Sequence, residues 1–97
     1  MIYEPPSMAE TIWVAELRIS NATAHKISTQ HGLQANEVRD AVEGVSGLQF
    51  VWDDDPQRGR RAIVETFIRG YRVLVVLYPA HDPLGDVFNL GSAYRIP

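Results

Sequence analysis

Residues 71–78, with the sequence YRVLVVLY, restrict the fold more than any other segment of this chain. Their side chains are apolar at nearly every position, so both faces of a strand formed here would be apolar. Strands of this kind lie inside a sheet and have a neighbour along each edge. The sequence therefore predicts a sheet built around residues 71–78, and the rest of the chain must supply the flanking strands.

Four other segments have the patterns of strands. In residues 11–19 the alternation predicts that Trp13, Ala15, Leu17 and Ile19 face the core. Gly91, inside the last segment, predicts a bulge or the close approach of another part of the chain. The predicted flanking strands are residues 11–19, 48–53, 60–69 and 86–96.

Breaker residues separate these strands. The acidic, proline-containing segment 53–59 predicts a turn, Gly70 predicts a tight return, and residues 79–85 predict a loop. Strands joined by such short connections pair in antiparallel hairpins. The second half of the chain is thus expected to form consecutive antiparallel strands.

Two short helices are predicted between the first strand and the others. Residues 22–30 follow Ser20, which suits an N-cap, and precede Gly32, which tolerates the left-handed conformation of a helix end. Residues 35–43 place Val38, Ala41, Val42 and Val45 on one face. Neither helix is long enough to be stable alone, so both must pack on the sheet.

The predicted fold is therefore α+β, in the order strand, helix, helix and four strands. We expect a mostly antiparallel sheet of four to five strands with both helices on one face. Residues 1–10 contain Pro5-Pro6 and are expected to form a flexible arm, and residues 11–97 a single domain. The chain has no cysteine, which excludes disulfides, a thiol nucleophile and a cysteine-based zinc site. No apolar run approaches the roughly 20 residues that span a bilayer.

The charges are unevenly distributed, although the net charge is only -3. Residues 1–57 hold nine acidic and three basic residues, whereas residues 58–97 hold three acidic residues and six arginines. Arginine suits forked contacts to phosphate. The arginines therefore point either to an RNA or protein partner, or to ordinary solubilising side chains on a sheet.

Three short motifs occur in a recognisable order. Gln30-His31-Gly32 ends the first helix, Arg58-Gly59-Arg60-Arg61 enters a strand, and Ser92-Ala93-Tyr94 lies on the last strand. Over residues 19–95 this order resembles the BrnT-like toxins of bacterial toxin–antitoxin pairs, which belong to the RelE-like ribonucleases. In that family a lysine stands at the position of Gln30 and an arginine at the position of Tyr94, and Arg61 matches its strand arginine.

The resemblance implies a cytoplasmic bacterial toxin that is an endoribonuclease and is neutralised by a cognate antitoxin. It implies RNA and the antitoxin as partners, no membrane, no metal and no other cofactor. A homodimer and a toxin–antitoxin hetero-oligomer are both compatible with it. The alternative is a protein-interaction module without enzymatic activity on a degenerate toxin-like fold, favoured by Tyr94 in place of arginine and by the acidic net charge.

RNA cleavage through the 2′-hydroxyl needs a base, a cation beside the phosphate and an acid. Histidine is the usual side chain for proton transfer near neutral pH, so His31 is a candidate base or acid; it also suits a purely structural role at the helix end. Glu65 is expected on the same strand face as Arg61, where the two could form an exposed ion pair. His25 is expected in solvent and His81 in a loop. The candidate catalytic residues are His31, Arg61, Glu65 and Tyr94, and the candidate RNA-binding residues are Arg58, Arg60, Arg72 and Arg95.

Overall fold

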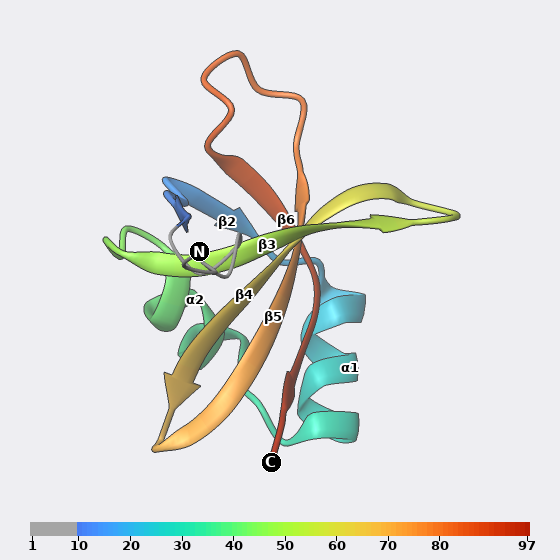
Figure 1. Cartoon of the computed structure of the whole chain (residues 1–97). Helices are drawn as coiled ribbons and strands as arrows, with labels where there is room; N and C mark the ends of the chain where they lie inside the picture. The colour runs from blue at the N-terminus through green and yellow to red at the C-terminus, as the bar shows by residue number, and fades with distance from the viewer. Residues whose placement is uncertain (1–9) are drawn as a thin grey trace, which may run out of the picture.

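The computed structural model describes residues 10–97, which form one six-stranded sheet and two helices (Figure 1). The predicted α+β class and element order are confirmed, with six strands in place of four or five. The predicted arm, residues 1–10, lies outside the described residues except for Glu10. The elements are β1 (Thr11–Ile12), β2 (Glu16–Arg18), α1 (Asn21–His31), α2 (Ala35–Val42), β3 (Leu48–Asp55), β4 (Gly59–Ile68), β5 (Tyr71–Pro79) and β6 (Val87–Arg95).

The sheet has the strand order β1-β3-β4-β5-β6-β2, and every pair is antiparallel except β2 with β6. β5 lies between β4 and β6, as its apolar faces predict. β1 and β2 lie at opposite edges of the sheet. The four residue steps from Ile12 to Glu16 reach at most about 14 Å, whereas the edges of a flat sheet of six strands are roughly 24 Å apart. The sheet must therefore curl until its two edges approach each other.

The prediction of one strand over residues 11–19 is wrong, because the segment forms two strands. The predicted direction of some of its side chains is wrong as well. The chain pairs with β3 through β1, forms a bridge between Val14 and Glu43, and then pairs with β6 through β2. This change of partner breaks the alternation. Ile12, Val14 and Leu17 are buried, whereas Trp13 and Ala15 are exposed.

The helices begin and end close to the predicted residues. Ser20 accepts a hydrogen bond from Thr23 N–H at the start of α1, and Gly32 ends the helix with a φ of 65°. Ile27 and Val38 are fully buried, and both helices contribute to one hydrophobic core with the sheet. In Figure 1, α2 lies to the left of β5 and α1 to its right.

The end of α2 also contacts the backbone of β2, which the sequence did not predict. Glu43 Oε2 accepts a hydrogen bond from Leu17 N–H at 2.8 Å, and the Arg39 guanidinium donates to Leu17 O at 2.8 Å. Neither residue belongs to the apolar face predicted for residues 35–43. They instead satisfy the backbone groups of a three-residue strand.

Two turns differ in how well the sequence predicts them. Arg69 and Gly70 both have positive φ and form the expected tight return, as in two-residue hairpins. The turn predicted over 53–59 is shorter than expected, because β3 continues to Asp55 and Asp55 pairs across the hairpin with Gly59. The three aspartates therefore lie at the end of a strand, beside the arginines of β4.

Gly91 forms the predicted bulge. Val76 pairs with Ser92 and Leu77 with Leu90, so Gly91 is the extra residue of β6. Gly91 also lies against the ring of Tyr78: a Cβ atom at position 91 would be 2.8 Å from Tyr78 Cδ2 and closer still to Cε2. The absence of a side chain at Gly91 is what allows the buried Tyr78 ring to lie across β6.

Candidate functional site

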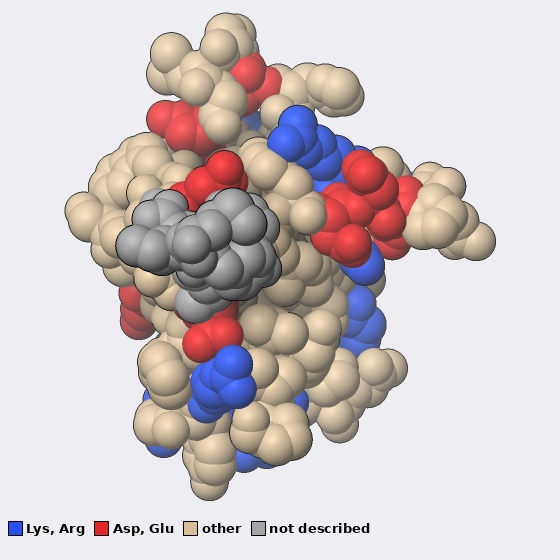
Figure 2. Space-filling view, in the orientation of Figure 1, with Lys and Arg blue, Asp and Glu red and all other residues tan. Residues whose placement is uncertain are grey.

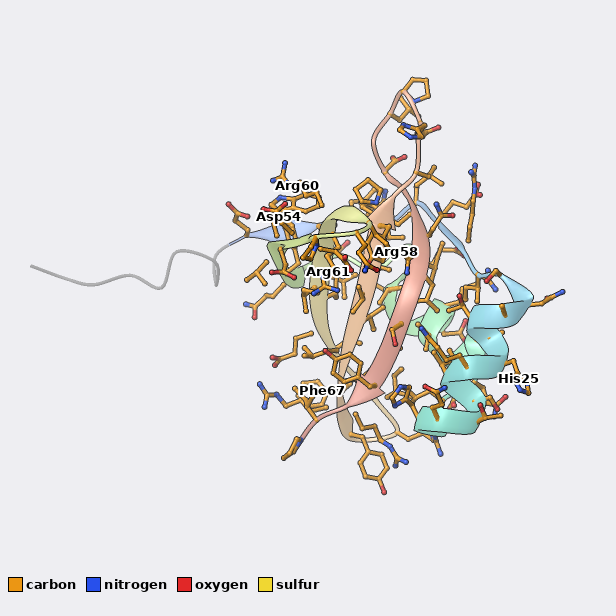
Figure 3. The ribbon with its side chains drawn as sticks, turned by 90° about the vertical axis from the view of Figure 1, so that its right-hand side faces the viewer. His25, Asp54, Arg58, Arg60, Arg61 and Phe67 are labelled. Carbon is orange, nitrogen blue, oxygen red and sulfur yellow. The ribbon has the colours of Figure 1, made fainter. Side chains whose placement is uncertain are left out.

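A cleft of about 280 Å³ is lined by the end of the β3–β4 hairpin, by β5 and β6, and by Lys26 of α1. Three of its lining side chains are cations, Lys26, Arg58 and Arg61, and one is a carboxylate, Asp55. Figure 3 shows Arg58 and Arg61 on the side of β6 that lies away from α1. The remaining lining residues are Ile63, Val76, Tyr78, Gly91, Ser92 and Tyr94.

Asp55 organises the hairpin side of this cleft. Its Oδ1 accepts hydrogen bonds from the backbone N–H groups of Gln57 (2.8 Å) and Arg58 (3.1 Å). Its Oδ2 accepts the Tyr78 hydroxyl at 3.0 Å and lies 3.4 Å from Arg61 Nη1. Four donors therefore converge on one carboxylate, and the backbone N–H groups are the main cause that lowers the pKa of Asp55 below its usual value.

The lowered pKa predicts how acid acts on the hairpin. A carboxyl group with a depressed folded-state pKa stabilises the fold above its unfolded pKa, and this contribution is lost as the pH falls through the folded pKa. We expect thermal stability to fall below about pH 4, near the usual aspartate pKa. Asp55→Asn should flatten that part of the pH profile, measured by circular dichroism melting between pH 2.5 and 6. Asp54→Asn, at the exposed neighbouring position, should leave it unchanged; equal effects of both variants would contradict the assignment.

Arg61 is not an unpaired cation. Its Nε and Nη2 both lie 2.7 Å from Asp53 Oδ2, and Asp55 lies on its other side. Two carboxylates neutralise it and hold it at the wall of the cleft. Figure 2 shows the corresponding mixture of red and blue side chains around the β3–β4 hairpin.

Arg58 and Lys26 have no such neutralising partner among residues 10–97. The Arg58 guanidinium lies over the Tyr78 ring, 3.9 Å from its centroid, and Lys26 Nζ donates to Gly91 O at 2.8 Å. No ion pair within the described chain involves either residue. These two side chains give the cleft its positive charge.

His31 and Tyr94 come together at the end of the cleft nearest the C-terminus of α1. Their ring centroids are 5.9 Å apart, with the planes tilted by 45°. Tyr94 also lines the cleft, and both side chains are partly exposed. The structure thus places an imidazole and a phenol from distant parts of the sequence beside a cationic cleft.

Four predicted site residues lie elsewhere. Glu65 and Arg72 share the sheet face with Arg61 but pair with each other at 2.9 Å, and the hydrogen bond from Arg72 lowers the pKa of Glu65. The expected Arg61–Glu65 pair is absent among the described contacts, because residues i and i+4 of a strand are about 13 Å apart.

The other two are on separate surfaces. Arg60 lies over the Trp52 ring, 4.0 Å from its centroid, and Figure 3 shows it beside Asp54 on the far side of the hairpin from Arg58. Arg95 lies over Tyr71 at 4.7 Å, next to Gly32. The bulge at Gly91 precedes Ser92, so side chains alternate regularly from residue 92 to residue 95. Arg95 therefore lies on the opposite face from Tyr94 and cannot replace an arginine at position 94.

The cleft also contains residues that were not among the predicted site residues: Lys26, Asp55 and Tyr78. The spacing of Ser20, Thr23 and Lys26 along α1 was the available signal for Lys26, since residues three apart share a helix face. His25 and His81 are exposed, as expected. No group of three or more histidine, aspartate or glutamate side chains within residues 10–97 is arranged to hold a metal ion.

Neither helix of the described chain combines the length and hydropathy that a membrane-spanning helix requires. Comparisons with family models, curated proteins and solved structures found no match to this chain.

Proposed function

We propose that this protein is an endoribonuclease of the toxin type, which binds RNA in the cleft and is neutralised by a cognate antitoxin. The observation that carries the proposal is the meeting of His31 and Tyr94 beside a cleft with two un-neutralised cations, Lys26 and Arg58. An imidazole can move a proton near neutral pH, a phenol can donate one, and the cations attract phosphate. The resemblance of the three sequence motifs to BrnT-like toxins supports the same reaction class.

In the proposed reaction, the ribose 2′-oxygen attacks the adjacent phosphorus while a base takes its proton. The bond from phosphorus to the 5′-oxygen breaks, and an acid gives that oxygen a proton. The products are a 2′,3′-cyclic phosphate and a 5′-hydroxyl. We assign the two proton transfers to His31 and Tyr94, and the stabilisation of the phosphorane charge to Lys26 and Arg58.

Arg61 then has a positioning role. Its two aspartate partners hold it in place, so it fixes the wall from which Arg58 extends. The same sheet face carries Phe67, which is 63% exposed, and the exposed Val51. Apolar side chains of this size on an open face offer contact area to a protein. An antitoxin bound there would cover both these residues and the cleft.

The test is cleavage of a fluorescently labelled RNA by the purified protein in the presence of a chelator, with the cyclic phosphate product identified by mass spectrometry. Removing a general acid or base lowers such rates by about 10²–10⁴-fold. We expect a loss of that size for His31→Ala and a clear loss for Tyr94→Phe. His81→Ala, at an exposed loop histidine, is the matched control and should keep full activity.

Cleavage that persists unchanged in His31→Ala would contradict the proposed site. Absence of cleavage by the folded wild-type protein would contradict it as well. The non-enzymatic interaction module would then be the better account.

A further inference from the structure

A second hollow, of about 430 Å³, lies directly beside the cleft. It is lined by Arg18 at the end of β2, by Ser20 and Thr23 at the start of α1, and by Asn89 of β6. Arg58 lines this hollow as well as the cleft, so the two share one wall. All five side chains can donate hydrogen bonds to an anion.

The two hollows lie next to each other along β6, with α1 on one side of this strand and the β3–β4 hairpin on the other; we call them together the groove. On β6, Asn89 and Leu90 line the second hollow, and the next residues, Gly91 and Ser92, line the cleft. On α1, Ser20 and Thr23 line the second hollow and Lys26 lines the cleft. His31 and Tyr94 follow in the same order at the far end. The eleven residues of α1 make this groove about 16 Å long.

Three positively charged side chains follow one another along the groove. Arg18 lies in the second hollow, Arg58 lies at the junction, and Lys26 lies in the cleft. Arg18 is paired with Glu16 at 2.8 Å, but its side chain is 56% exposed and an arginine has further N–H groups to donate. The positive end of α1 adds to the attraction of an anion at the second hollow.

We propose that one RNA strand runs along the whole groove, with a phosphate adjoining the cleaved one held in the second hollow by Arg18 and Arg58. This inference rests on the proposed function, since it takes RNA as the ligand of the cleft. It adds that the substrate is single-stranded and longer than a dinucleotide. Because the two hollows adjoin along β6 and share Arg58, neighbouring phosphates of one strand can lie in them.

The experiment compares the binding of a dinucleotide, which has one bridging phosphate, with that of a mixed-sequence decanucleotide. Both are 2′-O-methylated so that the attacking hydroxyl is blocked. Decamer binding is followed by fluorescence anisotropy over a range of salt concentrations, and dinucleotide binding by competition. We expect Arg18→Ala to weaken decamer binding about 5–10-fold and to reduce the salt slope by about 0.7, as for one phosphate contact on a single strand. Dinucleotide binding should not change.

Arg60→Ala is the matched control, because Arg60 belongs to the same hairpin as Arg58 but lies over Trp52, outside the groove. It should alter neither ligand's affinity, whereas Arg58→Ala should weaken both. Circular dichroism confirms that each variant is folded.

The outcomes separate the two proposals. The second subsite would be overturned if Arg18→Ala bound the decamer as tightly as the wild type, or if it bound both ligands more weakly by the same factor. The proposed function would still stand in that case, provided that the wild type cleaves RNA. If the wild type neither binds the decamer nor cleaves RNA, the proposed function fails and the inference fails with it.

Discussion

Replacing Val14 with aspartate is expected to unfold the protein. Val14 is fully buried in the segment that joins β1 to β2, and its carbonyl accepts a hydrogen bond from Gly44 N–H. A carboxyl group of similar volume would lie in the core without a partner, at a cost of several kcal/mol. That cost is comparable to the whole stability of a typical domain, about 5–15 kcal/mol.

The matched control is the same substitution one residue later. Ala15 is exposed in the structure, although the alternation of residues 11–19 assigns it to the core and Val14 to the outer face. We expect Ala15→Asp to change the free energy of unfolding by no more than about 0.5 kcal/mol. Urea titration followed by circular dichroism measures both variants. The reverse ranking would show that the segment forms the continuous strand predicted from the sequence.

The second large effect is expected at Gly91. In most strands a change from glycine to alanine is favourable, because glycine loses more conformational freedom on folding. Here the added methyl group would overlap the Tyr78 ring, which Asp55 holds by its hydroxyl and Arg58 covers on one face. We expect Gly91→Ala to destabilise the protein by about 1–3 kcal/mol. The melting temperature should fall by roughly 4–8 °C for each kcal/mol.

A double-mutant cycle identifies the cause. In a Tyr78→Ala background the ring is gone, so Gly91→Ala should be nearly neutral or stabilising. Equal costs in the two backgrounds would rule out the ring contact as the cause. Displacement of Tyr78 also removes the surface on which Arg58 lies, so Gly91→Ala should lower RNA cleavage even at temperatures where it remains folded.

The sequence predicts local structure well for helices and strands that pack the same face against the core along their whole length. The alternation in β4, the apolar faces of β5 and the cap residues Ser20 and Gly32 are of this kind. The prediction for residues 11–19 fails because the two halves of this segment pair with different strands. Their partners are residues 48–49 and 87–89, which are distant in the sequence. No local pattern contains this information, nor does any pattern contain the parallel pairing of β2 with β6.

The candidate site is predictable to a similar extent. His31, Arg58, Arg61 and Tyr94 were identified from motifs, and they lie in or beside one cleft. The expected Arg61–Glu65 pair is wrong, because Glu65 pairs instead with Arg72, a diagonal neighbour across the hairpin and not a residue on the same strand. Lys26 was missed because its partner, Gly91 O, is 65 residues away in the sequence.

The pairing of β2 with β6 has a consequence for synthesis. Glu16 lies beside Val87 and Leu17 beside Phe88, so two segments about 70 residues apart must meet before the sheet is complete. Contacts this distant in sequence slow folding, and domains form during translation only as their residues emerge. While the ribosome still holds β6, Leu17 has no strand to join and His31 has no Tyr94 beside it. The nascent chain therefore acquires its cleft only after β6 has left the exit tunnel.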